Sequence, residues 1–323
     1  MKKSVYFNSF EFAEKSAFRQ KCLAAGLATL CIFGVMVFWS EVYFPLLGVF
    51  GVTSTAARDF YNNPTGSHAV QIAVSFFMMV PAFAVVAAIF GIGGKIPYAA
   101  PKKQGLFAAI LLGVGFCFLA DYLSNITNSM FDVFGFEESA SVLDKMPSTP
   151  FGILIAAVSV SVMPALVEEF AMRGVILTLF KPFGNAIAIL CSATLFGFMH
   201  ARFSQFIFAF LVGLVLGFLT VKFNSVWPAV IVHFLNNFIS FSEQFVYNFF
   251  TKYSVLFNSV MFAAIIGVLF ISVLLISKKH NNFFNIESNN NGAATGKKAV
   301  WFFTHPAIIA VIIGSVYIAA FKR

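Results

Sequence analysis

The chain has 323 residues, of which 59% are hydrophobic and 11% are charged, with a mean hydropathy of +0.87 and a formal net charge of +8. Soluble domains contain about 45–50% apolar residues, so this composition excludes an ordinary soluble domain. The excess positive charge lies mainly in loop lysines and arginines. In a membrane protein such charge indicates orientation and contact with anionic membrane lipids, and it predicts no nucleic-acid partner.

Long apolar runs predict an all-α fold, a polytopic transmembrane helical bundle with about eight or nine spans. The first run is too long for a signal-peptide core and has no clear small-residue cleavage site, so we expect it to be a retained span. The four cysteines lie in or beside these runs, as buried small residues do. The predicted spans cover residues 22–50, 69–92, 105–124, 151–180, 185–201, 204–222, 226–249, 255–277 and 300–321.

The polar segments between the runs predict an orientation. The N-terminal segment and the loops at 93–104 and 278–299 are basic, whereas the loop at 121–150 is acidic. By the positive-inside rule, this pattern predicts a cytoplasmic N-terminus and nine spans, with the two C-terminal basic residues as an exception. Residues 52–68 are predicted to form a polar loop. We expect a multi-pass protein of the plasma (cell) membrane.

Three charges stand out inside the apolar run 151–180: Glu168, Glu169 and Arg173. Ionisable groups inside a membrane span cost several kcal/mol and often mark a functional site. Glu169 and Arg173 are four residues apart, about 40° on a helical wheel, and can form an ion pair. Glu168 lies about 100° from Glu169, so its carboxylate can point into a cavity. The simpler interpretation is a charged helix end with an internal ion pair.

Two later spans carry histidines with helical neighbours. His200 follows Phe196 by four residues, and Asn237 follows His233 by four, so each pair shares a helix face. Each histidine alone is more typical of a hydrogen-bonded packing residue. Counted from the turn near residue 182, however, Glu168 and His200 differ in depth by roughly 5 Å. Glu168, Glu169, His200, His233 and Asn237 can therefore share one layer of the bundle.

These residues carry a resemblance to a known family. Glu-Glu-x-x-x-Arg at 168–173, Phe-x-x-x-His at 196–200 and His-x-x-x-Asn at 233–237 occur in this order. They resemble the three motifs of the CPBP family, the CAAX proteases and bacteriocin-processing enzymes also called Abi. The resemblance covers about 150–240. It divides the chain into N-terminal helices and loops (1–149), a CPBP-like catalytic core (150–240), and C-terminal helices with an Asn-rich flexible loop (241–323).

The resemblance implies an intramembrane endopeptidase. In the family, the residue matching Glu168 is the base that activates water together with the residue matching His200. The residues matching His233 and Asn237 stabilise the oxyanion, and Glu169 would be held by Arg173. Phe196 has a supporting place in the second motif. We favour a mechanism without a cofactor. The family is often labelled a metalloprotease, and a divalent metal such as zinc would then be bound by Glu168, His200 and His233.

The expected partners are a protein or peptide substrate and membrane lipids. The substrate could be a prenylated protein, a peptide precursor or another membrane segment. Two other functions remain open: a non-catalytic membrane immunity or scaffold protein, and a transporter with a buried ion relay. The orientation is also open. The depth count puts the site nearer the acidic loop, on the predicted non-cytoplasmic side, whereas the eukaryotic CAAX enzymes that the chain resembles meet their substrates from the cytosol.

Overall fold

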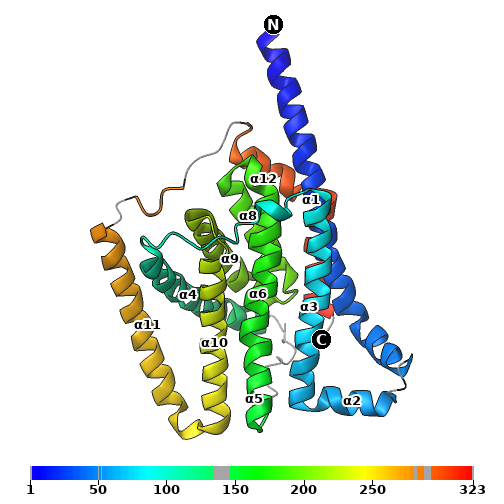
Figure 1. Cartoon of the computed structure of the whole chain (residues 1–323), viewed down its shortest axis with the longest axis vertical. Coiled ribbons are helices and arrows are strands. Elements are labelled where there is room, and N and C mark those ends of the chain that lie inside the picture. Colours follow the sequence, from blue (N-terminus) through cyan, green and yellow to red (C-terminus); the bar gives the residue numbers. More distant parts are fainter. Residues whose placement is uncertain are drawn as a thin grey trace.

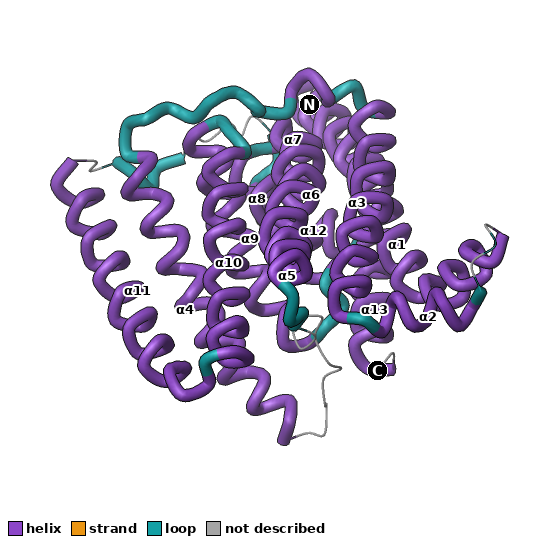
Figure 2. Tube along the Cα trace, turned by 60° about the horizontal axis from the view of Figure 1, so that its bottom comes forward, coloured by secondary structure: helices purple, strands orange, loops and turns teal. Residues whose placement is uncertain are grey.

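The computed structural model describes residues 2–49, 51, 53–133, 146–279, 282–286 and 292–321. Within these residues every regular element is helical, and the helices stand side by side in one bundle (Figure 1; Figure 2). The predicted all-α membrane fold is confirmed. In chain order the elements are α1 (Lys2–Val49), α2 (Ser54–Asn62), α3 (Pro64–Ile89), η1 (Gly93–Lys95), α4 (Leu106–Val133), α5 (Pro150–Ala157), η3 (Val158–Val162), α6 (Met163–Glu169), η4 (Phe170–Ile176), α7 (Leu177–Phe180), η5 (Lys181–Phe183), α8 (Asn185–Met199), α9 (Phe203–Phe223), α10 (Trp227–Phe249), α11 (Thr251–Lys279), α12 (Thr295–Phe303) and α13 (Pro306–Phe321).

Six described helical segments are long and apolar enough to cross a membrane. A seventh crossing is possible if α12 and α13, which are bent by 62° relative to each other, count as one span. The remaining two predicted spans correspond to α8, which has only 15 residues, and to α10, which has 23 residues but carries many polar side chains. The six segments are Glu11–Val37, Pro64–Ile89, Leu106–Thr127, Pro150–Phe183, Gln205–Phe223 and Thr251–Ser277.

Several boundaries differ from the predictions because helix caps and helix extensions replace loops. The predicted loop at 52–68 contains α2 and the start of α3, where Asn63 Oδ1 accepts the backbone N–H groups of Thr65 and Gly66 at 2.9 and 3.3 Å. Pro64 begins α3, a position where its missing N–H costs nothing. In the predicted acidic loop, α4 continues to residue 133, and residues 134–145 lie outside the described residues.

The fourth span is the irregular helix of the bundle. Two π-helical turns, η3 and η4, stand on either side of the short α-helix α6, which contains Glu168 and Glu169. In η3 the Met163 N–H bonds to the Val158 carbonyl, five residues back, instead of four. Pro164 follows directly and has no N–H to continue the α-helical ladder. π-helical turns of this kind occur often at functional sites.

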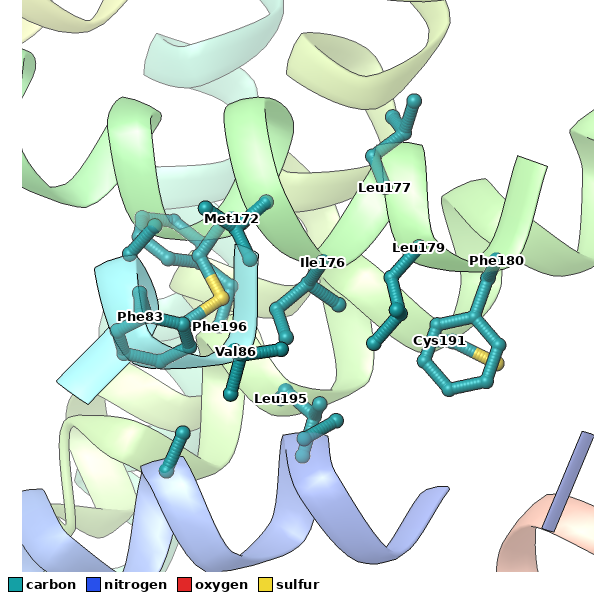
Figure 3. Close-up of a cluster of buried hydrophobic side chains, with 14 of the residues drawn as sticks. Phe83, Val86, Met172, Ile176, Leu177, Leu179, Phe180, Cys191, Leu195 and Phe196 are labelled. Atoms are coloured by element: carbon teal, nitrogen blue, oxygen red, sulfur yellow. The ribbon is translucent and has the colours of Figure 1, made fainter. Parts of the chain in front are cut away.

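The core packs the fourth span tightly against its neighbours. Met172, Ile176 and Phe180 belong to one buried cluster with Phe83 of α3 and Leu195 of α8 (Figure 3). The α8–α9 contact is closest at Gly213, where a Cβ atom would lie 2.9 Å from the Ala193 Cα. The spacing of Gly213 and Gly217 is typical of such close approach.

Three of the four cysteines are buried inside the bundle. Cys22, Cys117 and Cys191 are buried, and none of the three is in a disulfide. Cys31 of α1 is also free but exposed, which contradicts the prediction that all four are buried. An apolar run in a membrane helix does not say which of its residues face the bundle, because lipid-facing positions are apolar too.

Hydrogen bonds tie several connecting segments together at one end of the bundle. The Trp227 indole N–H donates to the Tyr98 carbonyl at 2.8 Å, and Lys181 Nζ donates to Asn224 Oδ1 at 3.0 Å. The buried Lys298 ammonium donates to the Phe183 carbonyl at 2.7 Å and lies 2.9 Å from the Glu14 carboxylate. These contacts join the N-terminal and C-terminal helices to the turn that ends the fourth span.

Candidate active site

A fully buried ion pair forms the base of the site. Glu169 Oε1 lies 2.6 Å from Arg173 Nη1, and neither side chain is accessible to solvent. Arg173 Nη2 also donates to the Gly213 carbonyl at 3.3 Å, and the guanidinium lies 4.4 Å from the centre of the Phe196 ring. The arginine is therefore fixed by a carboxylate, a carbonyl and an aromatic face. The i,i+4 spacing predicted this pair.

The same carboxylate oxygen orients His233. His233 Nδ1 lies 2.8 Å from Glu169 Oε1. A carboxylate paired with arginine accepts hydrogen bonds, so the imidazole carries a proton on Nδ1 and turns Nε2 away from Glu169. That Nε2 atom lies 3.9 Å from Glu168 Oε2. The two adjacent glutamates thus face the two nitrogens of one histidine.

His200 is held in the same tautomer by the backbone. Its Nδ1 lies 2.8 Å from the Phe196 carbonyl oxygen, which can only accept, so Nδ1 donates and Nε2 retains its lone pair when the ring is neutral. The Phe196 ring stands nearly perpendicular to both imidazoles, with centroid distances of 5.0 Å to His200 and 5.9 Å to His233. Phe196 therefore packs against Arg173 and both histidines.

Asn237 binds the irregular turn of the fourth span. Its side-chain Nδ2 donates to the Val160 carbonyl at 3.1 Å, and its Oδ1 accepts from Asn236 Nδ2 at 3.1 Å. In a regular α-helix the Val160 carbonyl would accept from the N–H of residue 164, but that residue is a proline. The missing backbone donor explains why this carbonyl takes a side-chain amide of another helix.

These groups meet at a cavity of about 500 Å³ inside the bundle. Glu168, with 18% of its side chain exposed, lines the cavity together with His200, His233 and Asn237. Glu169 and Arg173 lie behind the wall. The motif-bearing segments add Ser159, Val160, Pro164, Phe196, Met199, Asn236 and Ser240 to the wall, and Arg202 follows α8. Helices outside the three motifs supply the rest: Ile32 and Met36 of α1, Gln71, Ser75, Met78 and Met79 of α3, Asp121, Ser124 and Asn125 of α4, and Gln205, Phe208, Ala209 and Val212 of α9.

The structure thus brings the predicted residues together: Glu168, Phe196, His200, His233 and Asn237 line one cavity, and Glu169 and Arg173 lie behind its wall. Their catalytic roles stay predictions. Sequence reasoning missed Ser159, Arg202 and Asp121 on the cavity wall, and His68 behind it. The one signal for each was an isolated polar residue in or beside an apolar run, which also fits ordinary packing.

The candidate metal ligands do not form a ready ligand set. Among the described residues, no three His, Cys, Asp or Glu side chains are arranged to hold a metal ion.

Comparison with known proteins finds a family that is similar to this segment. Residues 150–239 match the family described as Rce1-like, type II CAAX prenyl endopeptidase. No curated protein and no solved structure gives a significant match to the chain. The matched segment holds Glu168, Glu169, Arg173, Phe196, His200, His233 and Asn237 and agrees with the CPBP resemblance. Residues 150–239 of this multi-pass membrane protein, less than a third of the chain, are therefore similar to the Rce1-like CAAX endopeptidases.

Proposed function

We propose that this protein is an intramembrane endopeptidase of the cell membrane, which hydrolyses a peptide bond in a membrane-associated or lipidated protein or peptide. The family match supports protease activity. The observation that carries the proposal is that two adjacent glutamates have different environments. Glu169 is buried against Arg173, whereas Glu168 lies on the cavity wall beside His233. A partly exposed carboxylate among imidazoles inside a membrane bundle suits proton transfer.

Glu168 and His200 activate the attacking water in this proposal. The Glu168 carboxylate accepts a proton from a water molecule in the cavity, and His200 Nε2 accepts the second hydrogen bond of that water. The fixed proton on His200 Nδ1 supports this role because it leaves Nε2 as the acceptor. The same carboxyl group then delivers the proton to the leaving amine, as a general base becomes a general acid.

His233 and Asn237 stabilise the oxyanion that forms on the substrate carbonyl. His233 Nε2 can donate only when the ring is an imidazolium, since Nδ1 already donates to Glu169. Asn237 Nδ2 has two hydrogens and directs one to Val160, so the second is available to the substrate. Donors held in a water-poor site stabilise such charge strongly.

The apolar side chains on the cavity wall favour a substrate with an apolar segment. Ile32, Met36, Met78, Met79 and Phe208 lie on the same cavity as the polar groups. Flexible methionine side chains fit irregular apolar surfaces well. We infer that the part of the substrate beside the cleaved bond is a membrane-embedded or lipid-modified segment.

The deciding experiment is peptide cleavage by detergent-purified protein, using a panel of prenylated and unmodified fluorogenic peptides. We expect Glu168→Gln to lower kcat by about 100-fold or more, because general acid–base groups contribute about 10²–10⁴-fold. Glu243→Gln is the matched control, since Glu243 is a partly buried carboxylate on α10 that does not line the cavity. We expect that variant to cleave like the wild type.

Each reaction is repeated with a chelator. Cleavage that is indifferent to the chelator supports the cofactor-free mechanism, and loss that zinc restores would assign the reaction to a metalloenzyme. Wild-type kcat in Glu168→Gln would remove Glu168 from the mechanism. Failure of the wild type on the whole panel, with ion flux into proteoliposomes, would favour a transporter.

A further inference from the structure

We propose that His68 is a positioning residue of this site: it holds the π-helical turn at Ser159, and that turn orients the oxyanion group Asn237. His68 lies on α3, outside the matched segment 150–239. The inference rests on the proposed function, because it assigns His68 a role in the same chemistry.

His68 makes a short contact with Ser159 deep in the protein. Its Nδ1 lies 2.7 Å from Ser159 Oγ, and the two residues are only 1% and 2% exposed. Ser159 Oγ also lies 3.0 Å from the Ala156 carbonyl, which can only accept. The hydroxyl therefore donates to Ala156 and accepts from His68 Nδ1–H. This places the mobile proton of the neutral imidazole on Nδ1.

Ser159 and Val160 are adjacent residues of the same π-helical turn, and helices on different sides hold them. α3 holds Ser159 through His68, and α10 holds Val160 through Asn237. Both Ser159 and Asn237 line the catalytic cavity. The direction of the Val160 carbonyl fixes one of the two Asn237 N–H groups, and the planar amide then fixes the direction of the other. A turn held at Ser159 is therefore coupled to the donor that Asn237 presents to the substrate.

The turn needs such support. π-helical turns are rare because their backbone geometry is less favourable than that of the α-helix. Pro164 removes the backbone donor that would otherwise fix Val160. Without the His68 contact, Ser159 loses its hydrogen bond to α3 and keeps the bond to the Ala156 carbonyl in its own span. α3 and the fourth span also approach each other closely at Thr65 and Gly152. Neither of these two residues lines the cavity.

The test compares His68→Leu with His68→Asn. Leucine removes the donor, whereas the Asn side-chain amide can place an N–H near the position of imidazole Nδ1. We expect His68→Leu to lower kcat by about 10–100-fold with little change in KM, in the range seen for lost orienting partners of a site. His68→Asn should recover most of the wild-type kcat, and Ser159→Ala should resemble His68→Leu.

A double variant separates positioning from general loss of structure. If His68 acts through Asn237, adding His68→Leu to Asn237→Ala should lower kcat by less than about twofold more, because the coupled group is already gone. Multiplicative loss in the double variant would overturn the proposal, as would failure of His68→Asn to recover kcat while it folds.

Hydrogen–deuterium exchange gives a readout that does not depend on cleavage. We expect amides in peptides spanning residues 156–165 to exchange faster in His68→Leu than in the wild type, and at the wild-type rate in His68→Asn. Unchanged exchange in His68→Leu would show that the turn does not depend on His68. A wild type without peptidase activity would sink the proposed function, while this exchange comparison would still decide the contact between His68 and the turn.

Discussion

Glu168 and Glu169 are adjacent on one helix, but their carboxylates have different surroundings. One residue turns the side chain by about 100°, which moves the carboxylate from a buried ion pair to a cavity wall. Glu169 has a guanidinium and an imidazole as partners on one oxygen. Substitution of Glu169 should therefore affect the stability of the protein and the orientation of the His233 ring. Substitution of Glu168 should affect the chemical step alone.

The first prediction concerns the buried charge pair. Arg173→Met leaves the Glu169 carboxylate buried without its cation, so we expect the free energy of unfolding to fall by about 3–5 kcal/mol. Denaturant unfolding in detergent measures the change. Lys103→Met is the control, because Lys103 is exposed and should cost nearly nothing. Equal stability of the two variants would contradict a structural role for the pair.

A companion variant tests the coupling. Glu169→Gln combined with Arg173→Met removes both charges, and we expect the double variant to lose less stability than the two single variants summed. A strictly additive loss would mean that the two side chains act independently, against the 2.6 Å contact between them.

At the scale of elements, the fourth span contains one feature that the sequence predicts, the ion pair, and one that it does not, the π-helical turns. The pairing of Glu169 with Arg173 follows from local spacing, and the structure contains it. The π-helical turns could not be predicted, since the contacts to them come from far along the chain. His68 and Ser159 are 91 residues apart, and Asn237 and Val160 are 77 apart. A single sequence gives no measure of which distant residues meet.

The positions of the membrane spans were predictable from the sequence, but some of their ends were not. Hydropathy identified every long apolar helix, because lipid exposure imposes the same composition on each of them. It could not place the start of α1 or the break between α12 and α13. The break lies at Pro306, which begins α13 and has no N–H to continue the helix from α12.

The second prediction concerns the contact between α8 and α9. Gly213→Ala would put a methyl group 2.9 Å from the Ala193 Cα, and a backbone atom cannot yield as a side chain can. The shift would also move the Gly213 carbonyl away from Arg173. We expect a loss of about 1–3 kcal/mol in unfolding free energy, the usual cost of overpacking.

Gly267→Ala is the matched control for that substitution. Gly267 lies on α11 with no atom within 4 Å of the added methyl group, so alanine there should be neutral or slightly stabilising. Thermal unfolding of the two purified variants compares them directly. The same midpoint for both would show that α8 and α9 tolerate a wider separation.

At the scale of the whole molecule, basic side chains gather at the end of the bundle where hydrogen bonds join the connecting segments. Lys181 and Lys222 lie at helix ends there and bond to segments near residues 224 and 282–285. The positive-inside rule predicts that this end faces the cytoplasm. His200 follows α8 at the opposite end from Lys181, so the same rule predicts that the cavity lies toward the other face of the membrane.

The third prediction follows from this arrangement and uses a membrane-impermeant thiol reagent on intact cells. The background carries Cys31→Ser, because Cys31 is the exposed cysteine of the described residues. We expect Phe250→Cys, in the exposed turn between α10 and α11, to be labelled, and Gly94→Cys, in the basic connection after α3, to be protected until the cells are opened. The reverse pattern would invert the orientation and put the cavity nearer the cytosol.

The contact between Lys298 and Glu14 also bears on how the protein is made. Glu14 lies on α1, 279 residues before Ala293, and its carboxylate binds both Lys298 Nζ and the Ala293 N–H at 2.9 and 2.8 Å. Until the 292–303 segment has been synthesised, the Glu14 carboxylate has neither of these two partners. A chain that stops short of that segment would lack both contacts even though all three motifs are complete.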